Sequence, residues 1–364
     1  MSGSVKTIPR ISGRINRKGY GILILWIGCR GGMEQVETVQ AMQEFIAGHF
    51  SEEGFCAEKV CMAAGYSRRH AERLFKEYTG KSIQEYIQAV RLTKGAGELL
   101  KGGKSVLEIA LDSHFRSHEG FTRSFHRRFR LTPSEYRERK IAIPWFTQYP
   151  VSHYYAMIRD KEETDMENKE NIGNARISEE TITMEKGETT EGRTELCTVT
   201  VCERPKRKLV YLPSRTANDY MSFCEEAGCD WEGLLNSIPE KFDTAALLEL
   251  PDFLAEGGFS RIAAGVEVPV DYDKVLPENY RMAELPACIM LYFQGEPYER
   301  DGDFGKEIRK VYGAVERYRP ERYGLRYAYG SAPSFNFGAD TSTGAKVAVP
   351  AVWNTGNGKQ GRNG

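Results

Sequence analysis

Two stretches of the chain, about 50 residues apart, follow the same plan. Residues 57–80 (AEKVCMAAGYSRRHAERLFKEYTG) predict a short helix, a turn at Gly65-Tyr66 and a second, cation-rich helix that begins at Ser67. Residues 105–130 (SVLEIALDSHFRSHEGFTRSFHRRFR) repeat this plan, with a turn at 113–116 and a second cationic helix that begins at Ser117. Apolar residues at helical spacing between 83 and 100 predict a connecting helix. The sequence therefore predicts two helix-turn-helix units joined by one helix.

Charge is distributed unevenly along the chain. Residues 55–140 contain 18 Lys and Arg against 10 Asp and Glu, whereas the rest contains 32 against 41, so the net charge of −1 conceals a basic segment. In a helix-turn-helix unit the second helix enters the major groove of DNA, and a basic unit suits that partner. A single basic helix can instead be merely solvated. Two of them at matched positions favour a protein that reads two successive major grooves of double-stranded DNA.

The predicted recognition helices offer two sets of side chains. Side chains on one face of the first two turns can reach bases, because Arg pairs with guanine O6 and N7 and Glu accepts from the cytosine amine. The predicted base contacts are Arg69, Glu72, Arg73, His118, Glu119 and Arg123. The predicted phosphate contacts, which set affinity and orientation, are Arg68, Lys76, Arg127, Arg128 and Arg130. The residues predicted to face the cores are Leu74, Phe75, Phe121 and Phe125.

Beyond residue 140 the composition changes. Residues 141–194 are predicted to be a flexible acidic linker, since 160–193 hold few large apolar residues. Alternating apolar residues then predict a domain of strand, helix, strand and strand, repeated once, with a central cleft suited to a ligand. Strands are predicted at 198–202, 208–211, 247–250, 262–268, 280–285, 288–293, 325–329 and 346–349, and helices near 218–236 and 303–318. Residues 354–364 are predicted to be a disordered tail.

The first 32 residues resemble neither part. Five cations precede an apolar run of about nine residues at 21–29, far below the roughly 20 that a transmembrane helix needs. Because the helical pattern begins directly after Met33, we interpret 1–32 as a leader that is not part of the native protein; a secretion signal is the alternative. The eight Cys lack the spacing of zinc sites and are interpreted as reduced thiols, with no metal or cofactor. These features predict a cytoplasmic protein without a membrane partner.

The helical segment resembles the DNA-binding domain of the AraC family of transcription regulators. The resemblance covers residues 34–140 and rests on Ala64-Gly65-Tyr66-Ser67, Phe115-x-Ser117-x3-Phe121-x-Arg123-x-Phe125 and Thr132-Pro133-x2-Tyr136-Arg137. It implies a monomeric all-α module, 33–140, whose linker helix holds two recognition helices against bent DNA, with the family's base-contact positions on the six residues given above. Two departures concern the connection: Ser113-His114 replaces a usual Gly, and Gly95 and Gly97 each cost about 1 kcal/mol relative to Ala, which predicts a less rigid linker helix.

Residues 195–353 resemble the GyrI-like effector-binding domain, on the basis of 263–269 and the closing 346–350. This implies an α+β domain of duplicated (βαββ)2 architecture, in a multidomain protein, that binds a small hydrophobic and often cationic ligand between aromatic residues and a carboxylate. The candidate ligand contacts are Trp231, Glu267, Tyr292, Phe293, Tyr327 and Tyr329. The alternative for each aromatic residue is a place in the core, which is the usual role of a Tyr or Trp on a strand of a small domain. Phe335-Asn336-Phe337 and Lys346 depart from the family's pattern.

Together these features predict a sequence-specific DNA-binding transcription regulator, with activation as the expected sense, that responds to a ligand and engages RNA polymerase. No catalytic residue is assigned, because no His lies beyond residue 153 and no nucleophile and base form a convincing pair. The alternatives are that the C-terminal domain is a small-molecule hydrolase or a drug-sequestering module fused to a DNA-binding domain.

Overall fold

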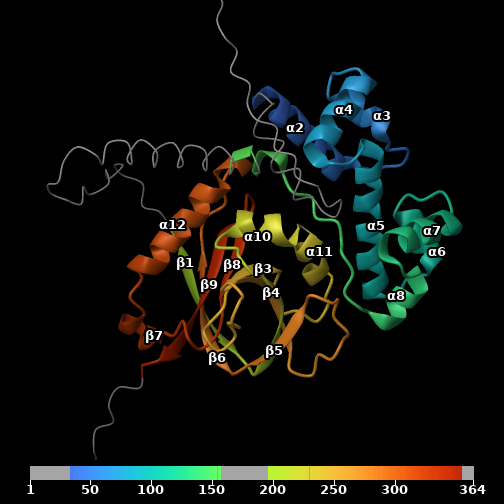
Figure 1. The fold of residues 1–364 in the computed structure, drawn as a ribbon. Coiled ribbons are helices and arrows are strands. Elements are labelled where there is room, and N and C mark those ends of the chain that lie inside the picture. Colours follow the sequence, from blue (N-terminus) through green and yellow to red (C-terminus); the bar gives the residue numbers. More distant parts are fainter. Residues whose placement is uncertain (1–32, 154, 157–195, 229, 355–364) are drawn as a thin grey trace, which may run out of the picture.

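The computed structural model describes residues 33–153, 155–156, 196–228 and 230–354 (Figure 1). The predicted leader, most of the predicted acidic linker and all but the first residue of the predicted tail lie outside these residues. The described chain comprises a helical N-terminal part and a C-terminal α+β part with an antiparallel sheet. None of the helices in these ranges is both long and apolar enough to cross a membrane.

The helical part has the two predicted helix-turn-helix units and their connecting helix. Its elements are α2 (Met33–His49), α3 (Ala57–Ala63), α4 (Arg68–Thr79), α5 (Ile83–Lys101), α6 (Val106–Asp112), α7 (His118–Phe129) and α8 (Pro133–Arg139). Local signals start several of them: Ser82, Ser105 and Thr132 each form a capping box with the Glu three residues later. The second helix of each unit begins after a Ser whose hydroxyl accepts a backbone N–H of the first turn.

Helix α5 carries one unit at each end (Figure 1). Its N-terminal half, including Ile83 and Ile87, lies in a core with α2, α3 and α4. Its C-terminal half, including Leu92 and Ala96, lies in a second core with α6, α7 and α8. The predicted core residues of the recognition helices are confirmed, since Leu74, Phe75, Phe121 and Phe125 are all buried. Each unit thus has its own core, and α5 fixes their relative position.

The glycines of α5 have a different role from the one expected. The helix runs through Gly95 and Gly97 without interruption. A Cβ at Gly95 would lie 2.9 Å from Cε2 of Phe121 and 3.0 Å from Oγ of Ser113, whereas a Cβ at Gly97 would only reach Trp145 at 3.9 Å. Gly95 therefore lets α7 and the second turn pack closely against α5. Helix propensity alone does not register this packing, so the sequence suggested only a cost for Gly95, and the expectation of a less rigid linker helix stays a prediction.

The α+β part is built on one nine-stranded antiparallel sheet within the described residues. Its strand order is β1-β6-β9-β8-β3-β4-β2-β5, and β7 pairs with β9. The strands are β1 (Thr198–Arg204), β2 (Arg207–Pro213), β3 (Ala246–Glu249), β4 (Ile262–Pro269), β5 (Arg281–Leu285), β6 (Cys288–Gln294), β7 (Leu325–Tyr327), β8 (Ser334–Asp340) and β9 (Gly344–Trp353). Every predicted strand is present, and β8 was missed. The helix expected near 218–236 is two helices, α10 (Tyr220–Ala227) and α11 (Asp230–Asn236), and α12 (Phe304–Arg317) matches the second expected helix.

The three helices of this part cover one face of the sheet. Helix α11 packs against β2 and β4 in a core that contains Trp231 and Val266, and α12 packs against β6 and β9 in a core that contains Phe293 and Val311. Alternate residues of the same strands point to the opposite face, as Ala263 does on β4. We call this opposite side, which contains the core of Leu209, Met290 and Phe335, the inner face.

Residues 141–153, which we call the strap, connect the two parts and contact both. The strap was predicted to belong to the flexible linker, but Ile143 and Val151 are each 2% exposed. The N–H of Ile143 donates to Oγ of Ser237 (2.9 Å) in the α+β part, and the N–H of Phe146 donates to Oγ1 of Thr93 (2.8 Å) on α5. The linker prediction is therefore wrong for these residues, because the strap is far more apolar than the acidic stretch that follows it.

Candidate nucleic-acid interface

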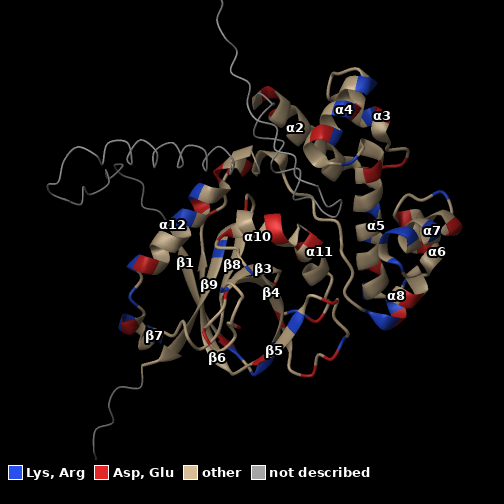
Figure 2. Cartoon of the chain, viewed as in Figure 1, with Lys and Arg blue, Asp and Glu red and all other residues tan. Residues whose placement is uncertain are grey.

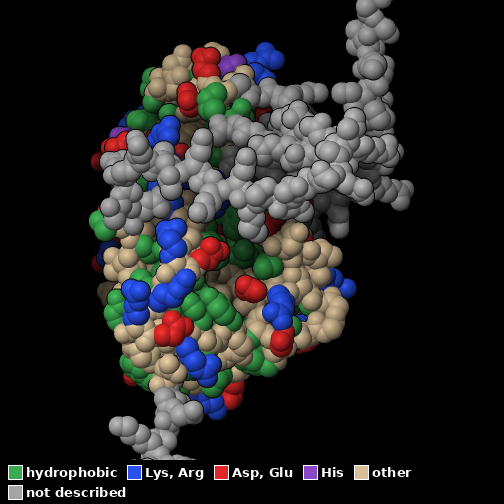
Figure 3. Space-filling model, turned by 90° about the vertical axis from the view of Figure 1, so that its left-hand side faces the viewer, with side chains coloured by type: hydrophobic (Ala, Val, Ile, Leu, Met, Phe, Trp, Pro, Cys, Tyr) green, Lys and Arg blue, Asp and Glu red, His purple; other side chains and the backbone are tan. Residues whose placement is uncertain are grey.

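The outer face of each recognition helix is cationic and exposed. Arg69 and Arg73 on α4, and Arg123 on α7, are exposed within the first two turns, and Glu119 is exposed beside Arg123. Figure 2 shows Lys and Arg on both units. On the face of the α+β part seen in Figure 3, by contrast, Lys and Arg are interspersed with Asp and Glu. The helical part thus offers the better surface for a polyanion.

Most cations on this surface have no carboxylate partner among the described residues. The unpaired ones are Arg69, Lys76, Arg116, Arg123, Arg127, Arg128 and Arg130. Arg68 pairs with Glu58 at 2.8 Å, and Arg73 approaches Glu77 at 3.5 Å. Exposed ion pairs of this kind contribute at most about 1 kcal/mol, so they can be exchanged for contacts to DNA. Unneutralised cations gain free energy from counterion release when they meet phosphates.

Glu72 is the predicted base contact whose geometry disagrees most with its assigned role. Its carboxylate accepts a hydrogen bond from the N–H of Ile83 (3.3 Å), the first residue of α5. A carboxylate is stabilised there by the positive end of the helix dipole. Glu72 therefore joins the recognition helix to the linker helix instead of pointing toward bases. No local sequence signal links Glu72 to a backbone group 11 residues away.

The remaining predicted residues fall into two groups. Lys76, Arg127 and Arg130 are exposed, as phosphate contacts would be, and His118 is half-buried at the first turn of α7. Arg128 is half-buried between α7 and α5.

The structure therefore gathers the candidate DNA contacts into one set at each end of α5. At 1.5 Å per residue its 19 residues make α5 about 28 Å long, comparable to the ~34 Å between successive major grooves.

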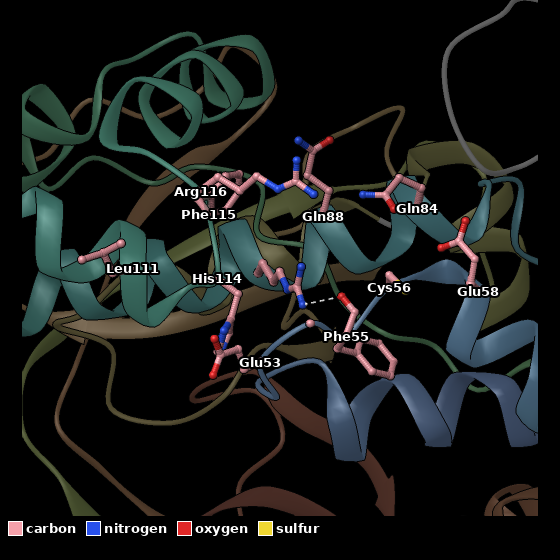
Figure 4. A pocket seen from close by; sticks show the side chains of 12 residues that line it. Glu53, Phe55, Cys56, Glu58, Gln84, Gln88, Leu111, His114, Phe115 and Arg116 are labelled. Atoms are coloured by element: carbon pink, nitrogen blue, oxygen red, sulfur yellow. Dashed lines mark hydrogen bonds between the residues drawn. The ribbon is translucent and has the colours of Figure 1, made fainter.

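A hollow of about 890 Å³ lies between the two units, over α5 (Figure 4). Gln84 and Gln88 line it from α5, and Arg116 lines it from the turn before α7. Arg91 holds its wall in place, because its guanidinium donates to the carbonyls of Phe50 and Phe55, at 3.0 Å each. The hollow thus lies between residues 53–58 of the first unit and the turn of the second unit.

His114 lies in this hollow at the turn of the second unit, where the family usually has Gly. Its φ of 58° is in the left-handed region, which explains why Gly is common at this position. Burial, together with Arg91 and Lys94, lowers the pKa of His114. We therefore expect a neutral imidazole at pH 7, which adds no charge to the interface.

The six predicted ligand contacts do not form one site. Trp231 is buried beneath α11 and Phe293 beneath α12, on the helix-covered face of the sheet. Tyr327 donates its hydroxyl to the carbonyl of Val315 (2.7 Å) on α12, and Tyr329 stacks on Tyr327. These four aromatic residues are therefore not part of an inner-face site, since they stabilise the helical layer or flank it. The sequence could not distinguish the two faces because both alternate with aromatic residues.

Glu267 and Tyr292 are the two predicted contacts that the structure does bring together. Oε1 of Glu267 is 2.6 Å from Nε of Arg207, a side chain with no exposed surface, and Oε2 is 3.3 Å from Nε of Arg204. Arg204 also donates to the hydroxyl of Tyr292 and lies over its ring. Burial raises the pKa of Glu267, and both guanidinium groups oppose that shift. The buried carboxylate is thus already neutralised by two cations.

Lys346 adds a further cation beside this cluster. Its ammonium lies 4.3 Å from the ring centroid of Phe337 and 5.1 Å from that of Tyr292, and it pairs with Asp243 at 2.7 Å. Sequence reasoning noticed Phe337 and Lys346 as departures from the family's pattern but missed Arg204 and Arg207. The sequence signal that could have found these two arginines is their position on either side of the Pro205-Lys206 turn. With three cations and two acids, this cluster does not resemble a site for a cationic ligand.

The fold and this surface define a DNA-binding protein with paired helix-turn-helix units. A family profile described as "Helix-turn-helix domain" matches residues 60–139. The chain is 43% identical over 93 residues to the Transposon Tn10 TetD protein of Escherichia coli, a match that covers 26% of this chain and 67% of that protein. It is 33% identical over 107 residues to the regulatory protein SoxS of Salmonella typhimurium, covering 29% of this chain and 99% of SoxS. It is 37% identical over 105 residues to the right origin-binding protein of E. coli, a match that covers 29% of this chain and 36% of that protein.

The family profile lies in the helical part, and the match to the right origin-binding protein spans about a third of that protein's length. The chain belongs to the AraC family of helix-turn-helix transcription regulators. The family is one of DNA-binding regulators rather than enzymes, in agreement with the sequence reasoning.

Proposed function

We propose that the protein recognises a specific DNA site by placing α4 and α7 in two successive major grooves. The single observation that carries this proposal is the presence of unpaired, exposed cations on the recognition helix at each end of α5. Arg69 and Arg73 would contact bases in one groove, and His118, Glu119 and Arg123 in the next. The phosphate contacts would come from Arg68, Lys76, Arg127, Arg128 and Arg130. Two relatives are named as an origin-binding protein and a regulatory protein, and these names support the proposal of DNA recognition.

The α+β part is proposed to be a duplicated effector-binding domain. The strand order supports this, because strands of the two halves occupy equivalent places from the centre of the sheet: β3 and β8, β4 and β9, β2 and β6, β1 and β5. The inner face around Tyr292 would then hold the ligand. Since Glu267 is already paired with Arg207, we propose a neutral or acidic hydrophobic ligand instead of a cationic one.

The strap provides a direct route from this domain to the DNA-binding units. A Cβ at Gly233 of α11 would lie 1.9 Å from the carbonyl oxygen of Trp145, so α11 and the strap are in close contact. Phe146 of the strap is hydrogen-bonded to α5. A ligand that shifts α11 would therefore move the strap against the linker helix. We propose this coupling, with activation through RNA polymerase as its outcome.

The hydrolase alternative loses its main candidate. Glu267 would have to act as a general base, but both of its oxygens lie close to guanidinium groups. Both oxygens are therefore engaged by these cations and are not free to take a proton from a substrate. We therefore do not propose catalysis.

The test of DNA reading is selection of bound sequences from a random duplex pool by the full chain, followed by affinity measurements with Arg73→Ala and Arg123→Ala. Each variant should lose roughly 1–3 kcal/mol at the selected site and should relax base preference in one groove only. Equal losses on selected and scrambled duplexes would show that these arginines do not read bases.

A further inference from the structure

The sheet of the α+β part has two free edges within the described ranges. β1 pairs only with β6 there, and β5 pairs only with β2 (Figure 1). The free side of an edge strand carries N–H and C=O groups with which another strand can pair, and proteins usually prevent that pairing with charged side chains or Pro. The side chains of each edge strand therefore indicate whether it can accept a partner.

The two edge strands differ in charge. On β5, Arg281 pairs with Glu256 at 2.6 Å. Glu284 on the same strand pairs with Lys206 at 2.7 Å. Residues 196–202, which include most of β1, read LCTVTVC and contain neither a charged residue nor Pro. Uncharged runs rich in β-branched residues are the ones that most readily add a strand. The β5 edge is therefore protected, and we call the free side of β1 the open edge.

The open edge also has an exposed apolar side chain. Val201 lies opposite Leu291 of β6, on the helix-covered face of the sheet, and yet it is 44% exposed. Thr198 and Thr200 alternate with it along the strand, and both are exposed. A strand added at the open edge would remove apolar surface of Val201 from water, which favours association.

The sequence of β1 is suited to pairing with a second copy of itself. When two β1 strands pair antiparallel about Thr200, Val199 lies opposite the partner's Val201, and symmetry repeats this pair. Both side chains lie on the helix-covered face, where Val199 already packs with the core of α12. Apolar β-branched pairs of this kind stabilise antiparallel strands. No like charges face each other across this register, because residues 196–202 carry none.

The same register also brings opposite charges together. It places Cys197 opposite the partner's Glu203, which is exposed at the end of β1. Arg317, the exposed last residue of α12, lies near Cys197. Burial raises the pKa of the Cys197 thiol, while a backbone hydrogen bond and the guanidinium of Arg317 lower it. Each copy would thus bring Glu203 to Arg317 of the other copy, a complementarity that selects a second copy as the occupant.

We propose that the open edge is a dimerisation surface, at which two copies of the chain join their sheets by antiparallel pairing of their β1 strands. The contact is isologous, so both copies use the same residues. An interface of one strand from each copy is small, below about 1,200 Å² in total, and we therefore expect a dissociation constant in the micromolar range. This inference goes beyond the proposed DNA reading and does not depend on it, since it concerns only the α+β part.

Sedimentation velocity of the full-length protein, from about 1 to 300 µM, measures the association. Wild type should change from monomer to dimer within this range. Val201→Lys places a charge opposite the partner's Val199 and should weaken the dimer about tenfold or more. Val275→Lys is the matched control, because Val275 is 81% exposed in the loop between β4 and β5, and it should dimerise as wild type does. A wild type that stays monomeric throughout, or equal dimerisation of the two Lys variants, would overturn the proposal.

Charge reversal tests the choice of a second copy. Glu203→Arg would place two cations together at each end of the interface and should weaken the dimer roughly tenfold. Combining it with Arg317→Glu restores opposite charges and should return the dissociation constant close to that of wild type. If the double variant is no tighter than Glu203→Arg alone, the contact between Glu203 and Arg317 is refuted, and with it the argument for self-pairing.

Cysteine cross-linking measures the register directly. Thr200→Cys places a thiol on the two-fold axis, within reach of its counterpart in the other copy, and should give a covalent dimer with oxidised glutathione. Wild type should not, because in this register Cys197 and Cys202 lie opposite the partner's Glu203 and the partner's Thr198. Equal amounts of covalent dimer from wild type and Thr200→Cys would contradict pairing about Thr200.

Hydrogen exchange distinguishes a second copy from any other occupant of the open edge. Amides of 198–202 should be protected above the dissociation constant and should exchange about tenfold faster well below it, with 281–285 on the β5 edge as the internal reference. Protection that is independent of concentration would assign the open edge to a segment of the same chain and overturn the dimer. Fast exchange at every concentration would overturn it as well.

Discussion

Replacing Gly95 by Ala tests whether close packing of α7 on α5 sets the position of the second recognition helix. The added Cβ would lie 2.9 Å from the buried ring of Phe121 and 3.0 Å from the buried hydroxyl of Ser113, which is closer than side chains normally approach. The ring is held between Phe115 and Phe125, with centroids 5.2 and 5.6 Å away, so it cannot move without disturbing the core.

The magnitude follows from two opposing effects. Overpacking a core costs about 1–3 kcal/mol, while replacing a helical Gly by Ala gains about 1 kcal/mol. We therefore expect Gly95→Ala to destabilise the second unit by about 0–2 kcal/mol. Gly97→Ala is the matched control, because its Cβ would meet Trp145 only at 3.9 Å and should add about 1 kcal/mol of stability. The two variants should differ by about 1–3 kcal/mol.

Hydrogen exchange of the full-length protein, read over peptides of 105–139 and 57–80, locates the effect. Amides of the second unit should exchange about 5-fold to 150-fold faster in Gly95→Ala than in Gly97→Ala, while those of the first unit stay unchanged. Equal protection of 105–139 in the two variants would refute the packing argument. In that case Gly95 would be an ordinary helical glycine.

Three further predictions test single contacts. Glu72→Gln should weaken the start of α5 by about 0.5–1 kcal/mol in urea unfolding, through loss of the charged contact to the N–H of Ile83, and should leave base preference intact; relaxed preference would restore Glu72 as a base contact. Glu267→Gln leaves Arg207 buried without its counterion and should destabilise the α+β part by about 3–5 kcal/mol; a variant as stable as wild type would show that the pair does not hold the inner face. Burial would raise the pKa of Glu226, but hydrogen bonds from the N–H groups of 215 and 216 and the hydroxyl of Ser214 outweigh it and lower this pKa to about 2. The contribution of Glu226 to folding stability is therefore present above pH 4.5 and is lost as the pH falls toward 2. An acid-unfolding curve unchanged by Glu226→Gln would contradict this.

The helical part could be predicted because its signals are local. Capping residues such as Ser82 and Ser105 act within one turn, and the apolar spacing of α4 and α7 places Phe75 and Phe121 inward without any long-range information. Local signals could not predict the hydrogen-bond partner of Glu72, because that partner, the N–H of Ile83, lies 11 residues away and beyond a turn. The same limit applies to the packing reason for Gly95.

The strands and helices of the α+β part were predicted in outline, but the charged partners of Glu267 were not. Strand β8 was missed because Gly338, with a φ of 81°, and a register shift between Asn336 and Ala339 interrupt its alternation. The partners of Glu267 come from the end of β1 (Arg204) and the start of β2 (Arg207), so its neutralisation depends on how the strands pair in the sheet. The strap was assigned to the linker because composition was averaged over residues that behave differently.

The claim that two recognition helices occupy successive major grooves is tested most directly by hydroxyl-radical footprinting of the full-length protein on a selected duplex. The expected result is two protected patches on one side of the duplex, with centres about 10–10.5 base pairs apart. Arg73→Ala should weaken protection in one patch and Arg123→Ala in the other. A single patch, or two patches on opposite sides of the duplex, would contradict the arrangement of both units along α5.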